Sequence, residues 1–498
     1  MDTAFTKMKN ISRIITLYTS ILQMLEWDQE TYMPTGAIDV RSDQIELLSG
    51  FIHKQKTSSS FKKALAKLVD LSSGKIIQKD LSLEENSAAR LWYKEWNQAS
   101  KLPSSFIKEC SKTSSASLHA WSQAKKEANF SIFKPFLEKT VILAQKKAHF
   151  LGYKEHPYDA LLDLYESEMT VTKLTPLFTE LKKSLTQLLQ KTKKSTSLIT
   201  LPSLDTEMQM LVGKDLLKYL GFPEETSRLD TSSHPFCIGI HPTDTRMTTR
   251  IFKDNLISHI LSVLHESGHG LYNSQLPLEY YGTPVCEPLS YGVDESQSRF
   301  FETLIGRNMP FWKFFYPTLQ KAFPKELGNI SLSDFYSLVN TVQPSLIRVE
   351  ADEVTYCLHI ILRFEIEKTL IEGSLQVKDL PTVWNLKMQE CLGISPSHDG
   401  EGCLQDIHWS MGSFGYFPTY ALGNLLAAQL YETLKSENPS LENEIEQGNF
   451  LNIRSWLKEN IHKHGKIYKT EELIQTVTKK PLSSAAYIAY LEKKYSNN

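Results

Sequence analysis

Hydrophobic side chains recur every three or four residues along most of the first third of the chain, with polar residues between them. This spacing predicts amphipathic helices that each bury one face. The predicted helices cover residues 11–25, 41–52, 83–96 and 174–189. A proline disfavours helical conformation in the residue before it, so the first helix is expected to stop before Pro34. Ser82 and Glu85 form a capping-box pattern that predicts the start of a helix. Loops are predicted at 58–60, 103–105 and 191–197.

The pattern changes between residues 234 and 251. Two segments rich in β-branched and apolar residues, 234–241 and 243–251, are separated by Pro242. We interpret them as two short strands, either a hairpin or part of a small sheet.

Helical spacing then returns for the remainder of the chain, starting with the apolar run 254–264. A loop containing proline and glycine is expected at 277–288, and another helix from about Val293. The segment 347–353 also lies within a helical pattern. Further breaks are expected near 393–402 and 412–418. The predicted fold class is therefore mainly α, with one small β element just before the helix that follows residue 254.

We find no internal repeat and no linker long enough to separate independent domains. The sequence is therefore predicted to form one large domain, 1–498. Its helical N-terminal part covers 1–200, and the part that holds most of the polar motifs covers 201–498.

Charge and cysteine usage indicate which partners and which compartment to expect. The net charge is −2 at pH 7, and lysines and arginines are dispersed, so we expect no nucleic-acid partner. The six cysteines are widely spaced without a CxxC pair, which indicates isolated thiols in a reducing compartment. We see no secretory signal pattern and no run of eighteen apolar residues, so we expect a cytoplasmic protein with no membrane partner.

The strongest chemical motif is His-Glu-Ser-Gly-His-Gly at 265–270. Residues four apart lie on one face of a helix, so His265 and His269 can bind one metal ion. Glu266 would then lie beside a metal-bound water, as in the HExxH motif of zinc peptidases. The alternative is an ordinary core helix with two hydrogen-bonded histidines. His259, six residues before the motif, points to another face and is expected in the core or behind the site.

A catalytic zinc needs a third protein ligand and leaves one position for water. Glu295, thirty residues after His265, is the best candidate because apolar residues beside it indicate a buried helix. Asp294 and Glu302 are weaker alternatives. In the competing interpretation, Glu295 simply pairs with Arg299 one turn further on. The residues alone thus predict a zinc hydrolase, most simply a peptidase.

Several blocks occur in an order that resembles one enzyme family, the carboxypeptidase Taq or thermostable carboxypeptidase family of zinc metallocarboxypeptidases. The blocks are 27–34, 234–236, 244–248, 265–269, 295–299, 347–352 and 402–409. One departure is Asp294, which stands where histidine is expected in relatives.

The resemblance implies a nearly all-helical glutamate-zincin fold with a deep groove, one wall of which comes from 1–200. It implies a homodimer with one Zn²⁺ per subunit, for which Co²⁺ is a possible substitute. The substrates would be peptides with a free C-terminus, cut one residue at a time. The implied zinc ligands are His265, His269 and Glu295.

The resemblance also implies roles for residues around the metal. Glu266 would be the general base, and Arg348 would bind the terminal carboxylate of the substrate through its planar guanidinium. His408 or Tyr420 would stabilise the oxyanion. The residues expected to line or shape the groove are His234, Asp244, Arg246, Gln405, His408 and Tyr420.

Two other functions stay open at this stage. An endopeptidase of the helical oligopeptidase type would share HExxH and a distant glutamate. A non-catalytic helical scaffold could keep a vestigial metal motif, although the intact Glu266 argues against it.

Overall fold

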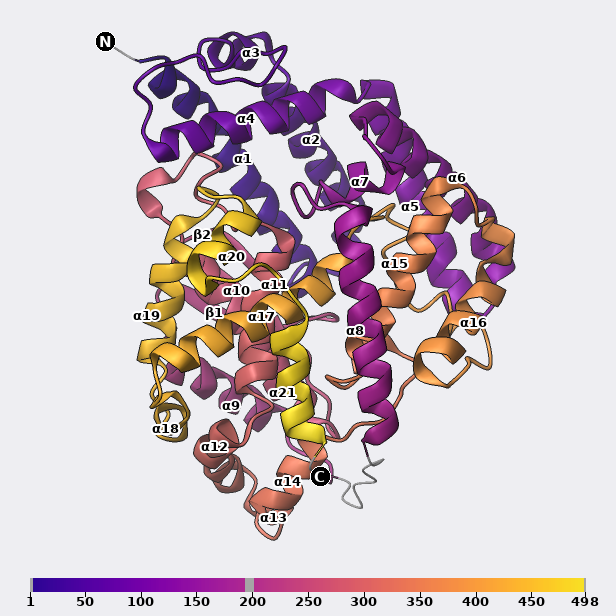
Figure 1. Cartoon of the computed structure of the whole chain (residues 1–498), viewed down its shortest axis with the longest axis vertical. Helices are drawn as coiled ribbons and strands as arrows, with labels where there is room; N and C mark the ends of the chain where they lie inside the picture. Colours follow the sequence, from indigo (N-terminus) through magenta and orange to yellow (C-terminus); the bar gives the residue numbers. More distant parts are fainter. Residues whose placement is uncertain (1–2, 193–200, 497–498) are drawn as a thin grey trace.

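The computed structural model describes residues 3–192 and 201–496, and it is built mainly of helices. The N-terminal helices are α1 (Ala4–Thr31), α2 (Ile38–Lys56), α3 (Ser59–Leu65), α4 (Leu83–Lys101), α5 (Ser104–Lys126), α6 (Phe130–Leu151), α7 (Pro157–Leu162) and α8 (Val171–Lys191). In Figure 1, α1 to α4 lie together at one end of the molecule. The four helices predicted from hydrophobic spacing are confirmed.

Local capping explains where several of these helices begin. The predicted capping box is present, because Glu85 N donates to Ser82 Oγ and Ser82 N donates to the Glu85 carboxylate. The predicted loop at 58–60 is wrong beyond its first residue. Ser58 Oγ accepts a hydrogen bond from Phe61 N at 3.1 Å and so starts α3. The predicted loop at 191–197 lies mostly outside the described residues.

The β element is a three-stranded sheet made of β1 (Ser227–Thr231), β2 (Cys237–His241) and β3 (Asp244–Thr249). The strand order is β1-β3-β2, with β2 antiparallel and β1 parallel to β3. The predicted hairpin is thus confirmed as β2 and β3, although 234–236 precede the strand. Strand β1 was missed because its Ser-Arg-Leu-Asp-Thr sequence is short and polar.

Three helices meet beside this sheet: α10 (Leu256–Ser274), α11 (Tyr291–Arg299) and α17 (Pro418–Glu437). Helix α11 packs between α10 and α17 and continues into a π-helical turn, Phe300–Ile305. Glycine permits both close approaches. A Cβ at Gly268 would lie 2.2 Å from Gln297 O, and one at Gly423 would lie 2.4 Å from Glu295 Cγ.

The remaining helices complete the second part of the chain. They are α9 (Thr206–Tyr219), α12 (Met309–Ala322), α13 (Pro324–Leu327), α14 (Leu332–Val339), α15 (Tyr356–Glu372), α16 (Leu380–Leu392), α18 (Leu441–Glu446), α19 (Leu451–Asn460), α20 (Thr470–Thr478) and α21 (Ala485–Tyr495). The helical interpretation of 347–353 is wrong. Only a single 3₁₀ turn, Arg348–Glu350, forms there, and α15 begins at Tyr356. The expected breaks between 393 and 418 are confirmed.

Apolar side chains gather in three clusters. One joins α6 and α8 to α15 and α16, and a second surrounds α10, α12 and α17. A smaller third cluster joins α1, α3 and α4. The division into one domain with parts at 1–200 and 201–498 stays a prediction.

Two expectations about the chain can be compared with the structure. All six cysteines are free thiols, in line with the expected isolated thiols. Among the described residues, no helix combines the length and hydropathy that crossing a bilayer requires.

Candidate metal centre and active site

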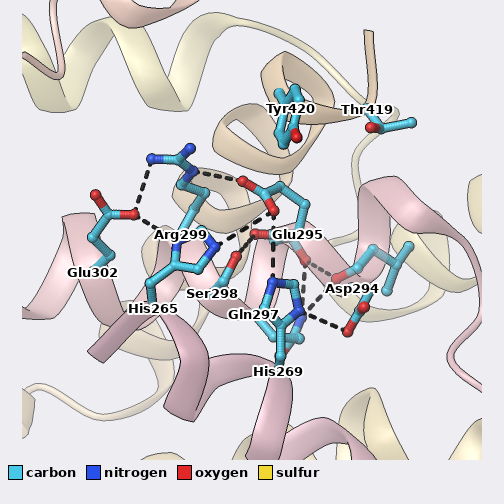
Figure 2. A network of polar contacts seen from close by, with 12 residues as sticks. His265, His269, Asp294, Glu295, Gln297, Ser298, Arg299, Glu302, Thr419 and Tyr420 are labelled. Atoms are coloured by element: carbon cyan, nitrogen blue, oxygen red, sulfur yellow. Dashed lines mark hydrogen bonds and ion pairs between the residues drawn. The ribbon is translucent and has the colours of Figure 1, made fainter. Parts of the chain in front are cut away.

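His265 and His269 lie one turn apart on α10 and face Glu295 on α11 (Figure 2). Glu295 Oε2 is 3.9 Å from His265 Nε2 and 3.7 Å from His269 Nε2. One ligand atom from each residue lies within 4.8 Å of the others. Tetrahedral zinc ligands with bonds near 2.0–2.1 Å are roughly 3.4 Å apart. The three side chains therefore fit a metal ion of this size after small adjustments.

Glu295 uses its two oxygens for different partners. Oε1 accepts a hydrogen bond from Arg299 Nε at 2.7 Å, while Oε2 faces the histidines. Burial alone would raise the pKa of Glu295, but Arg299 and the two histidines lower it below its usual value. The pairing with Arg299 and a role as metal ligand are thus compatible, because the arginine occupies the oxygen turned away from the histidines.

Each histidine has a carboxylate behind it. His265 Nδ1 lies 2.7 Å from Glu302 Oε2, which also accepts from Arg299 Nη1 at 2.9 Å. His269 Nδ1 lies 3.0 Å from Asp294 Oδ1. Partners of this kind fix the orientation and basicity of metal-binding imidazoles. The geometry therefore gives Asp294 and Glu302 this supporting position and leaves the ligand position to Glu295.

The site favours a cation. Burial alone would lower the pKa of His269, but Asp294, Glu266 and Glu295 raise it to about 10. Burial would likewise raise the pKa of Glu302, yet Arg299 and His265 lower it to about 2. The negative charge that holds a proton on His269 would equally attract a divalent metal ion.

Glu266 follows His265 on α10 and is buried. Burial raises the pKa of its carboxyl group, against the lowering effect of His265 and His269. A carboxyl group with a raised pKa exchanges protons closer to neutral pH than an exposed glutamate does, which suits general acid–base catalysis.

A second charged cluster contains two arginines and one aspartate. Arg348 Nε lies 2.9 Å from Asp406 Oδ1, and Arg363 Nε lies 2.7 Å from Asp406 Oδ2. Gln405 Oε1 accepts from Arg348 N at 2.9 Å and from Arg363 Nη2 at 2.7 Å. Arg348 is 7% exposed and Arg363 is fully buried. The sequence analysis missed Arg363, which sits alone in an apolar helical pattern.

Tyr356 connects this arginine cluster to the metal-binding residues. The Arg299 guanidinium lies 4.2 Å from the centre of the Tyr356 ring, and Arg348 Nη1 donates to Tyr356 Oη at 3.2 Å. Sequence analysis did not single out Tyr356, because nothing in a lone tyrosine at the start of a helix indicates its two partners.

His408 and Tyr420 lie near Arg348. The Arg348 guanidinium is 5.0 Å from the Tyr420 ring centre, and His408 Nε2 is 3.3 Å from Tyr420 Oη. Burial lowers the pKa of His408 to about 4 and raises that of Tyr420. Near neutral pH the imidazole is therefore uncharged and the phenol protonated.

Three predicted groove residues, His234, Asp244 and Arg246, lie on or next to the sheet. Arg246 pairs with Asp244 at 2.8 and 2.9 Å, and its guanidinium lies 4.7 Å from the Trp27 ring centre. His234 is exposed and its carbonyl accepts from Ser232 Oγ. Within the described residues, no hydrogen bond or ion pair joins these three to the metal-binding cluster. His259 is buried between Thr249 Oγ1 and Gln209 O, as a core histidine.

A cavity of about 730 Å³ opens beside the site. Its lining includes residues of α1, α4 and β2 and of the segment 284–291. Asp294, which contacts His269, is among the lining residues. The cavity thus reaches the carboxylate beside His269, whereas His265, His269, Glu295 and Arg348 are not among its lining residues.

Three comparisons with known proteins identify the family of the chain. The profile of the family described as carboxypeptidase Taq (M32) metallopeptidase matches residues 7–495. Carboxypeptidase 1 of Bacillus subtilis is 39% identical, with 99% of this chain and 97% of that protein covered. Thermostable carboxypeptidase 1 of Thermus thermophilus is 37% identical, with 99% of each covered.

Solved structures agree as well. The structure described as Pyrococcus furiosus carboxypeptidase Apo-Mg is 36% identical, with a TM-score of 0.95 and 99% of each chain covered. The match extends over the helices, the small sheet and the metal-binding cluster alike. The chain therefore belongs to the carboxypeptidase Taq (M32) metallopeptidase family and is a metal-dependent carboxypeptidase.

Proposed function

We propose that this carboxypeptidase binds one zinc ion through His265, His269 and Glu295 and releases single residues from the C-termini of peptides. The observation that carries the proposal is a buried excess of positive charge close to the metal-binding residues. Within residues 3–192 and 201–496, the ion pairs of Arg348 and Arg363 go to one carboxylate, that of Asp406. A substrate with a free C-terminus brings the second carboxylate.

The arginine cluster suits a terminal carboxylate for two reasons. A buried charge without a partner is costly, so an incoming anion that pairs with it is bound favourably. A guanidinium also presents a planar pair of donors that matches a carboxylate. Arg348 is the proposed contact, because it is the more exposed arginine and neighbours Tyr420 and His408. Asp406 accepts a hydrogen bond from its Nε, and Gln405 accepts one from its backbone N.

Zinc is proposed because two imidazoles and one carboxylate form a known ligand set of catalytic zinc, with a position left for water. When bound, zinc supplies Lewis-acid polarisation of the scissile carbonyl and lowers the pKa of a coordinated water towards ~7. Asp294 and Glu302 hold the two imidazoles with Nε2 towards Glu295.

The protein's own groups then move the protons. Glu266 accepts a proton from the attacking water and passes it to the leaving amine. Tyr420 stays protonated near neutral pH, so it or His408 can donate a hydrogen bond to the developing oxyanion. The rest of the peptide extends into the 730 Å³ cavity. We propose that Asp244, Arg246 and His234 shape the groove from the side of the sheet.

The deciding experiment compares an N-blocked peptide that ends in a free carboxylate with the same peptide ending in an amide. We expect single residues to be released, with kcat/KM at least about tenfold higher for the free acid. Equal cleavage of both, or internal cuts, would favour the endopeptidase alternative.

Metal dependence is tested on the same peptides. Chelation should abolish hydrolysis and one equivalent of zinc per chain should restore it, with cobalt proposed as a substitute. Hydrolysis that is absent both before chelation and after zinc is added would favour the scaffold alternative.

Two further proposals concern assembly, which rests on the family resemblance, and location, which rests on the widely spaced, isolated cysteines. We propose a homodimer, which sedimentation equilibrium would test through the mass in solution. We also propose a cytoplasmic location, which fractionation of the native cells would test.

A further inference from the structure

Side chains of α21 bind a buried carboxylate, that of Glu353, in the segment that carries Arg348. Glu353 lies between the 3₁₀ turn Arg348–Glu350 and the start of α15, and it is 5% exposed. Its Oε1 accepts from Lys494 Nζ and Tyr495 Oη, and its Oε2 accepts from Tyr490 Oη at 3.1 Å. All three of these side-chain partners belong to α21.

The backbone of the same segment is also held by α21. Tyr487 Oη donates to the carbonyl oxygen of Glu353 at 2.6 Å, and Tyr487 is fully buried. In addition, Asp352 Oδ2 accepts from Gln343 N at 3.1 Å, which closes the segment into a loop. The loop 343–355 is therefore closed by the hydrogen bond between Gln343 and Asp352, with Arg348 inside the closed segment, and it is bound to α21 at Glu353.

Helix α21 also contacts the far end of the metal-binding region. Lys494 Nζ donates to Arg307 O at 2.7 Å, just beyond the π-helical turn that holds Glu302. Figure 1 shows α21 lying next to α17, the helix that packs on Glu295. Lys494 thus links Glu353, in the loop that carries Arg348, to Arg307, which follows α11 and its π-helical turn.

We propose that Lys494, Tyr490 and Tyr495 are positioning residues, which hold Arg348 at a fixed place relative to the metal-binding residues through Glu353. Their side chains bind the segment at Glu353, five residues after Arg348. The inference rests on the proposed function, since it assigns these residues an effect on recognition of the substrate carboxylate.

The test compares the free-acid and amidated peptides on two variants of the full chain. The double variant Glu353→Gln/Lys494→Met removes both buried charges together, so neither is left unpaired. Lys493→Met is the matched control, because Lys493 is exposed on the same helix. Thermal stability and metal content are measured for each variant alongside KM and kcat.

We expect the double variant to raise KM for the free acid about tenfold and to reduce the preference for free acid over amide to a similar extent. Metal content should stay at one equivalent, and Lys493→Met should behave like the wild type. A purely structural role would lower the melting temperature and leave the preference unchanged, which would overturn the inference.

A second variant keeps the inference testable if the double variant does not fold. Tyr495→Phe removes one hydrogen bond to Glu353 and leaves Lys494 in place, and it should weaken the free-acid preference about threefold. An unchanged preference in Tyr495→Phe would then overturn the inference. If the wild type itself shows no preference for the free acid, the proposed function fails instead, before any variant is considered.

Discussion

Asp294 lies 3.0 Å from the Nδ1 atom of His269, on the side of the imidazole ring away from Glu295. The carboxylate thereby leaves Nε2 as the nitrogen directed towards the other two ligands. His265 also has a carboxylate beside it, and there Nδ1 is hydrogen-bonded to Glu302 Oε2 at 2.7 Å. In this chain both metal-binding histidines therefore have a carboxylate partner, although a histidine is expected at position 294 in relatives.

We predict that Asp294→Asn weakens zinc binding about 10- to 100-fold, because loss of the carboxylate lowers the basicity and order of His269. Competition with a chelator of known affinity measures this directly, without reference to activity. Asp254→Asn, at an exposed position before α10, serves as the control. An affinity equal to the wild type would mean that Asp294 does not support the metal.

Glu266→Gln should keep zinc bound and lose about 10²- to 10⁴-fold in kcat, because an amide cannot accept the proton of the attacking water. Metal content and turnover are measured on the same preparation. Activity close to the wild type would contradict the assigned role of Glu266 as general base.

Arg348→Ala should harm free-acid substrates more than amidated ones. The variant leaves Arg363 paired with Asp406, so the remaining cluster is neutral and no longer attracts a second carboxylate. The ratio of kcat/KM between the two substrates is the measurement. An equal loss on both would remove the assigned role of Arg348.

Tyr356→Phe separates the two contacts of this tyrosine. The ring that lies against Arg299 is kept, whereas the hydroxyl that accepts from Arg348 is lost. A hydrogen bond to a charged group contributes about 1.5–3 kcal/mol, so KM for the free acid should rise at least about tenfold. Zinc affinity should be unchanged. A fall in zinc affinity would show instead that the hydroxyl acts on the metal-binding residues.

The stability of the protein should depend on the buried His259. Burial lowers its pKa to about 4, below the unfolded value near 6.5. The neutral form is favoured by folding, so this contribution is complete above about pH 6.5 and is lost as the pH falls towards 4. The amount lost is up to ~3 kcal/mol.

His259→Gln is the matched variant, since glutamine does not titrate. Urea unfolding of both metal-free proteins gives the free energy of unfolding at each pH. The advantage of the wild type over the variant should shrink between pH 7 and pH 4. Curves that stay parallel would show that His259 does not contribute to the acid sensitivity.

Local periodicity was enough to predict much of the metal site. Helical geometry alone brings His265 and His269 to one face, and the buried pattern after residue 293 identified Glu295. The partners behind these ligands depend on how α11 lies against α10. Gly268 sets that approach by contact with the backbone of Gln297, and no spacing in the sequence encodes it.

The arginine cluster could be predicted only in part. The resemblance pointed to Arg348, but the helical pattern around it was misleading. The segment forms a 3₁₀ turn in a loop that is closed by a hydrogen bond from Gln343 N to Asp352 Oδ2. Arg363 and Asp406 lie 43 residues apart and meet only when the loop before α17 folds onto α15. Such a pairing comes from tertiary structure.

The close approach at Gly423 bears on which ions the site can accept. A single methyl group there would press on Glu295 within 2.4 Å of its Cγ and move the carboxylate relative to the histidines. The radius of the cation that fits is therefore governed partly by the backbone spacing of α11 and α17. A side chain at position 423 would thus disturb the His265, His269 and Glu295 cluster without itself offering a ligand atom.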